Sequence, residues 1–205
     1  VVTKAVLRLV PKPEGRWTCV AAFENERKAL SAVKSLLGEG LVPSILEYLD
    51  VNSVHCAEDI AGVRLFKEVG GKPLLLIEFD GNPSDLRLAK RTVRAWADRL
   101  ALAFKEARGD KAADNLWEVR RKCSGAMFAL GNAKINEDIV VPLESQLKFS
   151  DQLKRLQKRW NLPMPTFGHA ADGNFHVNIM FHREDPDELE RAEGAVGDLM
   201  KMVVD

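Results

Sequence analysis

The sequence predicts an α+β fold, in which helices cover an antiparallel sheet built from ferredoxin-like split βαβ units. Over residues 17–105 the patterns follow the order strand, helix, strand, strand, helix, strand, which is the order of one such unit. Further on, Asp172-Gly173 between two β-prone runs predicts a hairpin, because a tight type I′ turn needs positive φ at both central residues. With 46% hydrophobic residues among 205, the chain can bury one sizeable core.

The first half of the chain supplies the elements of this unit in order. Apolar alternation or continuous apolar runs predict strands, and apolar residues at helical spacing predict helices. Residues 1–10 are expected to be β-like. The expected strands are 17–23, 44–50 and 74–79, and the expected helices are 25–37, stopped by Gly38, and 84–100, capped by Ser84. Residues 100–105 fit either a helical continuation or the short fourth strand. The stretch 51–72 is expected to be irregular, and His55 within it to have no catalytic role.

In the second half, helices are expected at 111–127 and 143–160, with an extended segment at 138–141 between them. After the hairpin, Asp185 followed by Pro186 predicts a last helix, because proline is favoured at the first helical position. The expected buried face of this helix consists of Leu189, Ala192, Val196, Leu199 and Val203.

Composition excludes several classes of partner. Thirty basic and thirty acidic residues cancel, and there is a single tyrosine, so neither a basic face nor an aromatic platform is available for nucleic acid. No apolar run reaches the roughly 18 residues of a membrane span, and no signal-peptide pattern is visible, so we expect a cytoplasmic protein. Cys19, Cys56 and Cys123 form no C-x-x-C pattern, which favours reduced, packed thiols.

The predicted hairpin contains two of the four histidines. A two-residue loop would place His169 opposite His176, with Cβ atoms about 4.5–5.5 Å apart. Asn178 would share their face, because strand side chains repeat every two residues. Two imidazoles form half of a metal site, since zinc takes three or four ligands. The alternative is a hairpin that carries two ordinary polar histidines.

A second group of polar residues lies on the helix expected at 111–127. Arg120 and Ser124 are one turn apart on the same face. A guanidinium with a hydroxyl beside it suits a carboxylate, because it donates two parallel charge-assisted hydrogen bonds. The alternative is a solvated basic helix face.

Three segments carry a resemblance to a known family. Residues 168–178, G-H-A-A-D-G-N-F-H-V-N, resemble the G-H-x-G-D-G-N-x-H-x-N segment in the C-terminal domain of FAD-linked oxidases, with Ala171 where that family usually has glycine. This family includes D-lactate dehydrogenases, the glycolate oxidase D subunit and D-2-hydroxyglutarate dehydrogenase. Residues 116–120, L-W-E-V-R, resemble its L-W-x-x-R helix. Residues 3–13 resemble the passage from its flavin domain into its substrate domain.

The resemblance implies roles for individual residues. Arg120 would bind the substrate's carboxylate, with Ser124 and Asn178 beside it. Lys134 would also contact substrate, although its spacing from the following aspartate differs by two from that of relatives. His169 and His176 would bind a divalent metal such as zinc or manganese. No residue of this chain is expected to be catalytic in its own right.

The resemblance also implies a domain division and a cofactor. Residues 1–16 would end a flavin domain or linker, and 17–205 would form a substrate domain cut at its C-terminus, before the family's S-G-E-H-G-I-G block. FAD would be bound mainly by a domain in cis, since this sequence has no G-x-G-x-x-G. The implied activity is oxidation of a small D-2-hydroxy acid of the lactate or glycolate type to the 2-oxo acid by the full-length protein. That protein would be a monomer or a homodimer. This chain alone would be inactive.

Two other classes of function stay open. One is a stand-alone ferredoxin-like module that binds a metal or ligand without flavin chemistry. The other is a metal-dependent hydrolase built on His169, His176 and Asp172, which would need a third ligand and an open water position.

Overall fold

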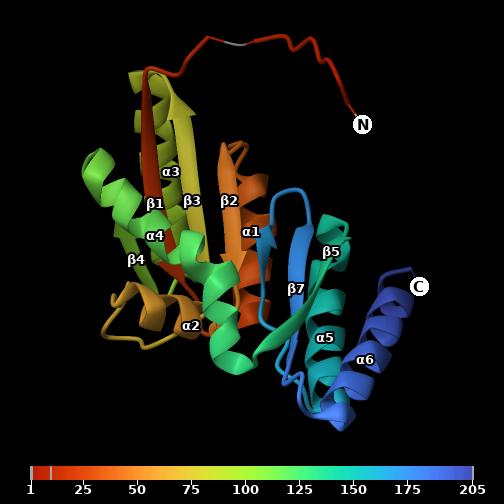
Figure 1. Ribbon diagram of the computed structural model, residues 1–205. Helices are drawn as coiled ribbons and strands as arrows, with labels where there is room; N and C mark the ends of the chain where they lie inside the picture. Colours follow the sequence, from red (N-terminus) through yellow and green to blue (C-terminus); the bar gives the residue numbers. More distant parts are fainter. Residues whose placement is uncertain (1, 10, 205) are drawn as a thin grey trace.

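The computed structural model describes residues 2–9 and 11–204, and a seven-stranded sheet lies at its centre (Figure 1). The strands lie in the order β4-β1-β3-β2-β6-β7-β5, and every neighbouring pair is antiparallel. Their bounds are β1 Gly15–Ala22, β2 Ile45–Leu49, β3 Leu74–Gly81, β4 Ala103–Glu106, β5 Ala133–Val140, β6 Thr166–His169 and β7 Asn174–Phe181. The predicted α+β fold with an antiparallel sheet is confirmed.

Helices cover the two faces of this sheet unequally. One face packs against α1 Glu26–Gly38, α3 Pro83–Leu100, α5 Gln146–Trp160 and α6 Pro186–Val204, which enclose the larger apolar core. The other face packs against α2 Val51–Ala61, α4 Asp110–Ala126 and the short 3-10 helix η1 Met127–Leu130. A further 3-10 turn, η2 Leu143–Ser145, leads into α5. The sheet is therefore buried on both sides only where α2, α4 and η1 reach.

Strands β4, β1, β3 and β2 with helices α1 and α3 form the ferredoxin-like unit predicted for residues 17–105. The short fourth strand is real, because β4 pairs with β1 from Cys19 to Ala22. Asn25 caps α1 by accepting a hydrogen bond from the Lys28 amide at 3.0 Å. The cap of α3 is Asn82 rather than the predicted Ser84, because its side chain accepts from the amides of residues 84 and 85.

The stretch 51–72, predicted to be irregular, contains helix α2. Asp50 begins this helix by accepting a hydrogen bond from the Ser53 amide at 2.8 Å, and Gly62 ends it in the left-handed conformation at φ 65°. The buried face of α2 includes the polar Ser53 and Glu58, so its apolar spacing is interrupted. That interruption hid the helix from a search based on apolar periodicity.

The hairpin of β6 and β7 forms, but its register differs from the predicted one. His169 pairs with Asn174, so the four residues 170–173 connect the strands instead of two. Only Gly173 in this loop has positive φ, at 76°, whereas a type I′ turn needs two such residues. Because the error is two positions, His169 and His176 still share one face, with ring centroids 5.9 Å apart.

Three smaller expectations also need correction. Residues 2–9, predicted as β-like, form no strand, since this segment lies away from the sheet and a strand needs a neighbouring strand to pair with (Figure 1); residues 1 and 10 lie outside the described part. Strand β5 begins at residue 133, five residues before the extended segment predicted at 138. In α6, Leu189 is exposed, whereas Ala192 and Leu199 are buried as predicted.

The arrangement leaves one region of the sheet uncovered, which we call the open face. It is the part of the sheet formed by β6, β7 and β5, on the same face that α4 covers elsewhere. Polar side chains on this side include Lys134, Asn136, Asp138, His169 and His176, together with the buried Asn178. No helix in the described part of the chain combines the length and apolar character needed to cross a lipid bilayer.

Candidate functional site

The predicted carboxylate ligand, Arg120, extends from α4 to the edge of the open face. Its Nε donates a hydrogen bond to Oε2 of Glu47 on β2 at 2.5 Å. Its guanidinium carbon lies 4.6 Å from the centre of the Phe167 ring, so an aromatic face supports it from below. No described residue accepts a hydrogen bond from its two terminal nitrogens. The guanidinium is thus held by Nε, and its two-nitrogen fork remains available to an anion.

The two imidazoles of the open face are each held by a carboxylate. Nδ1 of His169 donates to Oε1 of Glu47, and Nδ1 of His176 donates to Oδ1 of Asp138. The contact with His176 lowers the pKa of Asp138, so this carboxyl stays ionised and keeps accepting. Donation by Nδ1 fixes the tautomer and leaves Nε2 as the lone-pair atom of each ring.

This arrangement fits a divalent metal at His169 and His176. Metal-bound histidines commonly donate their other ring N–H to a carboxylate, which orients the ring and increases its basicity. The two rings supply only two ligands, and the described residues contain no group of three His, Cys, Asp or Glu side chains able to hold an ion. Asp172 does not complete such a group, so the third ligand that the hydrolase alternative needs is not found among the described residues. A metal held there would need one or two further ligands.

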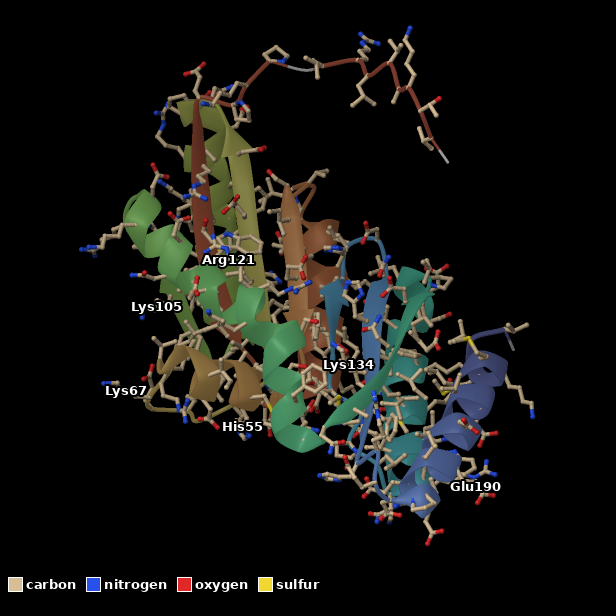
Figure 2. The ribbon with its side chains drawn as sticks, in the orientation of Figure 1. His55, Lys67, Lys105, Arg121, Lys134 and Glu190 are labelled. Carbon is tan, nitrogen blue, oxygen red and sulfur yellow. The ribbon has the colours of Figure 1, made fainter. Side chains whose placement is uncertain are left out.

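The three remaining predicted residues form a second cluster at the other end of the open face. Nζ of Lys134 donates to Oγ and the backbone oxygen of Ser124 at 3.0 and 3.1 Å, and to Oδ1 of Asn178 at 3.3 Å. Figure 2 shows Lys134 between the last turns of α4 and strand β5. Partial burial lowers the pKa of the Lys134 ammonium. Ser124 therefore contacts Lys134, and not Arg120 as their helical spacing suggested.

Asn178 connects the second cluster to the histidines through the backbone of β7. Its side chain is fully buried, at 0% exposure, and its Nδ2 donates to the backbone oxygens of Pro165 and His176 at 3.3 Å. The amide orientation is thereby set, and Oδ1 points toward Lys134. Asn178 can therefore position the Lys134 ammonium for an acidic group on the open face.

A pocket of about 520 Å³ adjoins the site on the side of Arg120. Its walls include Glu47, Arg120 and His169 together with Trp117, whose indole N–H donates to Glu78 at 2.9 Å. The pocket is large enough for a small organic acid and opens beside the free fork of the guanidinium. His55 does not take part, because it lies on α2 near the foot of the molecule in Figure 2.

Sequence reasoning missed Glu47 and the role of Asp138. Glu47 is only 2% exposed, and it interrupts the otherwise apolar strand I-L-E-Y-L. A charged residue at the centre of a buried strand was a usable signal, because burying a carboxylate is costly unless it is paired. Its partners could not be found from the sequence, since Arg120 is 73 and His169 is 122 positions away.

The fold and the site together define a class of protein: an α+β domain whose sheet is covered by helices on one face and only partly covered on the other, where charged side chains lie on the open face. Comparison with known proteins gives the family. Residues 12–205 match the family described as FAD linked oxidases, C-terminal domain. The chain belongs to this family.

Three curated relatives match 94% or more of this chain. Glycolate oxidase subunit GlcD of Bacillus subtilis is 30% identical over 206 residues, covering 100% of this chain and 43% of the relative. The GlcD subunit of Escherichia coli K12 is 28% identical, with 100% and 41% covered. A mitochondrial D-lactate dehydrogenase (cytochrome) of Arabidopsis thaliana is 26% identical, with 94% and 34% covered. The chain thus spans about two-fifths of the length of the GlcD relatives.

Solved structures share the fold at low sequence identity. A p-cresol methylhydroxylase with substrate bound matches with a TM-score of 0.73 at 13% identity, covering 94% of this chain and 44% of that one. A 4-ethylphenol oxidase from Gulosibacter chungangensis matches with a TM-score of 0.68 at 14% identity, covering 95% and 45%. At this identity the likeness shows the fold alone.

Proposed function

We propose that this chain is the substrate-binding domain of an FAD-dependent dehydrogenase or oxidase that converts a small D-2-hydroxy acid, of the lactate or glycolate type, to the 2-oxo acid. One observation carries the proposal: the guanidinium of Arg120 and the imidazole of His169 are held by the two oxygens of one carboxylate, beside a pocket of about 520 Å³. Membership of the family and the names of the relatives support it.

Each residue of the site has a proposed task in binding. The two terminal nitrogens of Arg120 would bind the substrate carboxylate as a bidentate pair. Lys134, positioned by Asn178 and Ser124, would contribute a second positive charge near the substrate. These contacts would orient the α-carbon of the acid toward the open face, where its hydrogen can leave.

His169 and His176 would hold a divalent metal such as zinc or manganese through their Nε2 atoms. Such a metal would supply a Lewis acid that lowers the pKa of a coordinated hydroxyl, and FAD would supply the hydride acceptor. The FAD-binding domain would be joined in cis and cover the open face, a proposal supported by the chain's match to only 43% and 41% of the length of its GlcD relatives. A homodimer and a cytoplasmic location remain predictions.

The proposal is tested by substituting Arg120 in the complete flavoprotein, that is, this chain together with its FAD-binding part. Arg120→Ala should lower kcat/KM for D-lactate or glycolate more than tenfold, about 1.4 kcal/mol, because the carboxylate loses its bidentate partner. Dye reduction dependent on the acid measures this effect.

Lys122→Ala provides the matched control, since Lys122 lies on the same helix but is exposed and pairs only with Glu118. Its kcat/KM should equal that of the wild type. Equal values for Arg120→Ala and the wild type would remove the clamp role, and absence of any 2-hydroxy-acid activity in the wild type would remove the proposed function.

A further inference from the structure

Glu47 is the residue through which the two halves of the site touch. It lies on β2 near the middle of the sheet, and its carboxylate is almost completely enclosed. A buried carboxylate is tolerated only when both oxygens are hydrogen-bonded and the charge is paired. Arg120 supplies the charge, and the ring N–H of His169 supplies the second bond. Asp138, by contrast, is exposed, and it accepts from His176 and, at 3.5 Å, from the amide of Asn136.

The geometry of these two contacts is selective. Glu47 engages Arg120 through Nε, the nitrogen that is not part of the terminal fork, and the Phe167 ring fixes the plane of the guanidinium. It engages His169 through Nδ1, the nitrogen opposite the one that faces the open face. In both cases the carboxylate holds the atom that a ligand does not need.

We infer that Glu47 is a positioning residue that sets the orientation of the Arg120 fork and the tautomer of His169 at the same time. The inference rests on the proposed function, since it assumes that Arg120 and His169 are the ligand-binding groups. It makes Glu47 the common support of the carboxylate clamp and of half of the metal site, so the spacing between substrate and metal depends on one side chain.

Glu47→Gln separates the two contacts. Arg120 and His169 face different oxygens of Glu47, and the amide replaces one of these oxygens with a donor NH₂ group, so only one of the two contacts keeps its acceptor. Arg120 always donates, and its charge claims the oxygen. The NH₂ group then faces Nδ1 of His169, which must become an acceptor and move its proton to Nε2. Nε2 is the atom that would bind the metal, so metal binding should weaken while the Arg120 fork is retained.

Two measurements on this chain test the inference. Long-range ¹H–¹⁵N NMR at alkaline pH, where imidazole is neutral, should show His169 with its proton on Nδ1 in the wild type and on Nε2 in Glu47→Gln; the resonance is assigned by its loss in His169→Gln. Titration with zinc alone should show at least tenfold weaker binding in Glu47→Gln, the scale typical of losing a partner that orients a metal ligand.

Glu58→Gln is the matched control. Glu58 is also buried, but it lies on α2 and accepts from the Leu65 amide at 2.7 Å. This variant should keep the wild-type tautomer of His169 and the wild-type zinc affinity. It shows whether a buried glutamate replaced by glutamine disturbs the histidine merely by weakening the fold.

The outcomes separate this inference from the proposed function. A proton on Nε2 of His169 in the wild type overturns the inference whether or not the variant folds. Equal zinc affinity in the wild type and Glu47→Gln also overturns it. A tautomer switch in a chain that binds no zinc supports the positioning role of Glu47 and removes the metal from the proposed function.

Discussion

Buried carboxylates on the central strands join helices to the sheet, and each accepts hydrogen bonds from specific side chains or backbone amides. Glu78 on β3 accepts from the Thr18 hydroxyl and from the Trp117 indole. Glu47 on the neighbouring strand accepts from Arg120, one turn further along α4. Helix α4 is therefore fixed by two carboxylates from adjacent strands, and its residues 117 and 120 are placed at the pocket as a result.

Asp50 has a different task, because it holds backbone instead of side chains. Its two oxygens accept from the amides of Ser53 and Thr166, which joins the start of α2 to β6. Burial raises the pKa of Asp50 to about 7, although the hydrogen bonds oppose that shift. Since the pKa of the folded state exceeds the reference value of 3.8, the folded chain binds more protons than the unfolded chain between these two pH values.

The sign of the resulting pH dependence follows from this difference. The contribution of Asp50 to the free energy of unfolding is fully present below about pH 4 and is lost as the pH rises to about 7. Asp50→Asn should remove this dependence of the unfolding free energy on pH. Between pH 4 and pH 7 the wild type should therefore lose stability relative to the variant. Urea denaturation at pH 4, 5.5 and 7, with exposed Asp59→Asn as control, measures it. Parallel curves would contradict the assignment.

At the scale of elements, the loop of the hairpin depends on one glycine. Gly173 has φ 76°, and a Cβ there would lie 1.9 Å from the backbone oxygen of Val141. The Gly173 carbonyl also accepts from the Val141 amide at 2.9 Å, so the loop is tied to the chain that follows β5. The backbone has no room for a side chain here, and the position of His169 and Asn174 depends on it.

Gly173→Ala should therefore lower the free energy of unfolding by more than about 1–2 kcal/mol, the cost of the left-handed conformation alone, because the contact with Val141 adds to it. Gly125→Ala is the matched control on α4, where an added Cβ meets no atom within 4 Å. Alanine there should stabilise the chain by about 0.5–1 kcal/mol. Urea denaturation measures the unfolding free energy of both variants. If Gly173→Ala lowers it by about 1 kcal/mol or less, the loop relaxes to accommodate the added Cβ.

The elements differ in how far the sequence could predict them. The ferredoxin-like unit was predictable because its strands and helices carry regular apolar spacing, and the start of α6 because Asp185-Pro186 is a local signal. The register of the hairpin was not, since Asp172-Gly173 fits a two-residue turn locally while the pairing of four strands around it selects a longer loop. Local chemistry set the element, and non-local pairing set its register.

The residues of the candidate site also differ in how far the sequence could predict them. His169, His176 and Asn178 could be placed on one face from the sequence, because two positions of error in register preserve the face. Glu47 could not be joined to Arg120 and His169, since that contact exists only after three distant segments have packed. The sequence therefore supplies the proposed ligand-binding groups, and the tertiary fold supplies the carboxylate that contacts two of them.

At the scale of the whole molecule, the open face is the surface where the proposed FAD-binding domain would dock. His169 lies there, with 51% of its side chain exposed. His55 is also exposed, but it lies on α2, away from this face (Figure 2). The two histidines thus report on different surfaces of the same chain.

Diethyl pyrocarbonate, which modifies accessible imidazole nitrogens, should label both histidines in this chain alone. In the complete flavoprotein, His169 should be protected at least tenfold relative to His55, because the docked domain would cover Nε2. Mass spectrometry of digested peptides gives the ratio, with His55 as the internal reference. Equal labelling of His169 in both preparations would show that the open face stays uncovered.

The three cysteines allow local opening of the fold to be measured. Cys19, Cys56 and Cys123 are all buried free thiols, and burial raises the pKa of each, that of Cys123 to about 12. A buried, protonated thiol does not react with an alkylating or disulfide reagent until the chain opens around it. Cys19 lies in β1 beneath α1 and α3, whereas Cys56 and Cys123 lie between α2 and α4. The rate at which each thiol is modified therefore reports how often the chain opens on that face of the sheet. Comparing the rates would reveal which layer of helices detaches first.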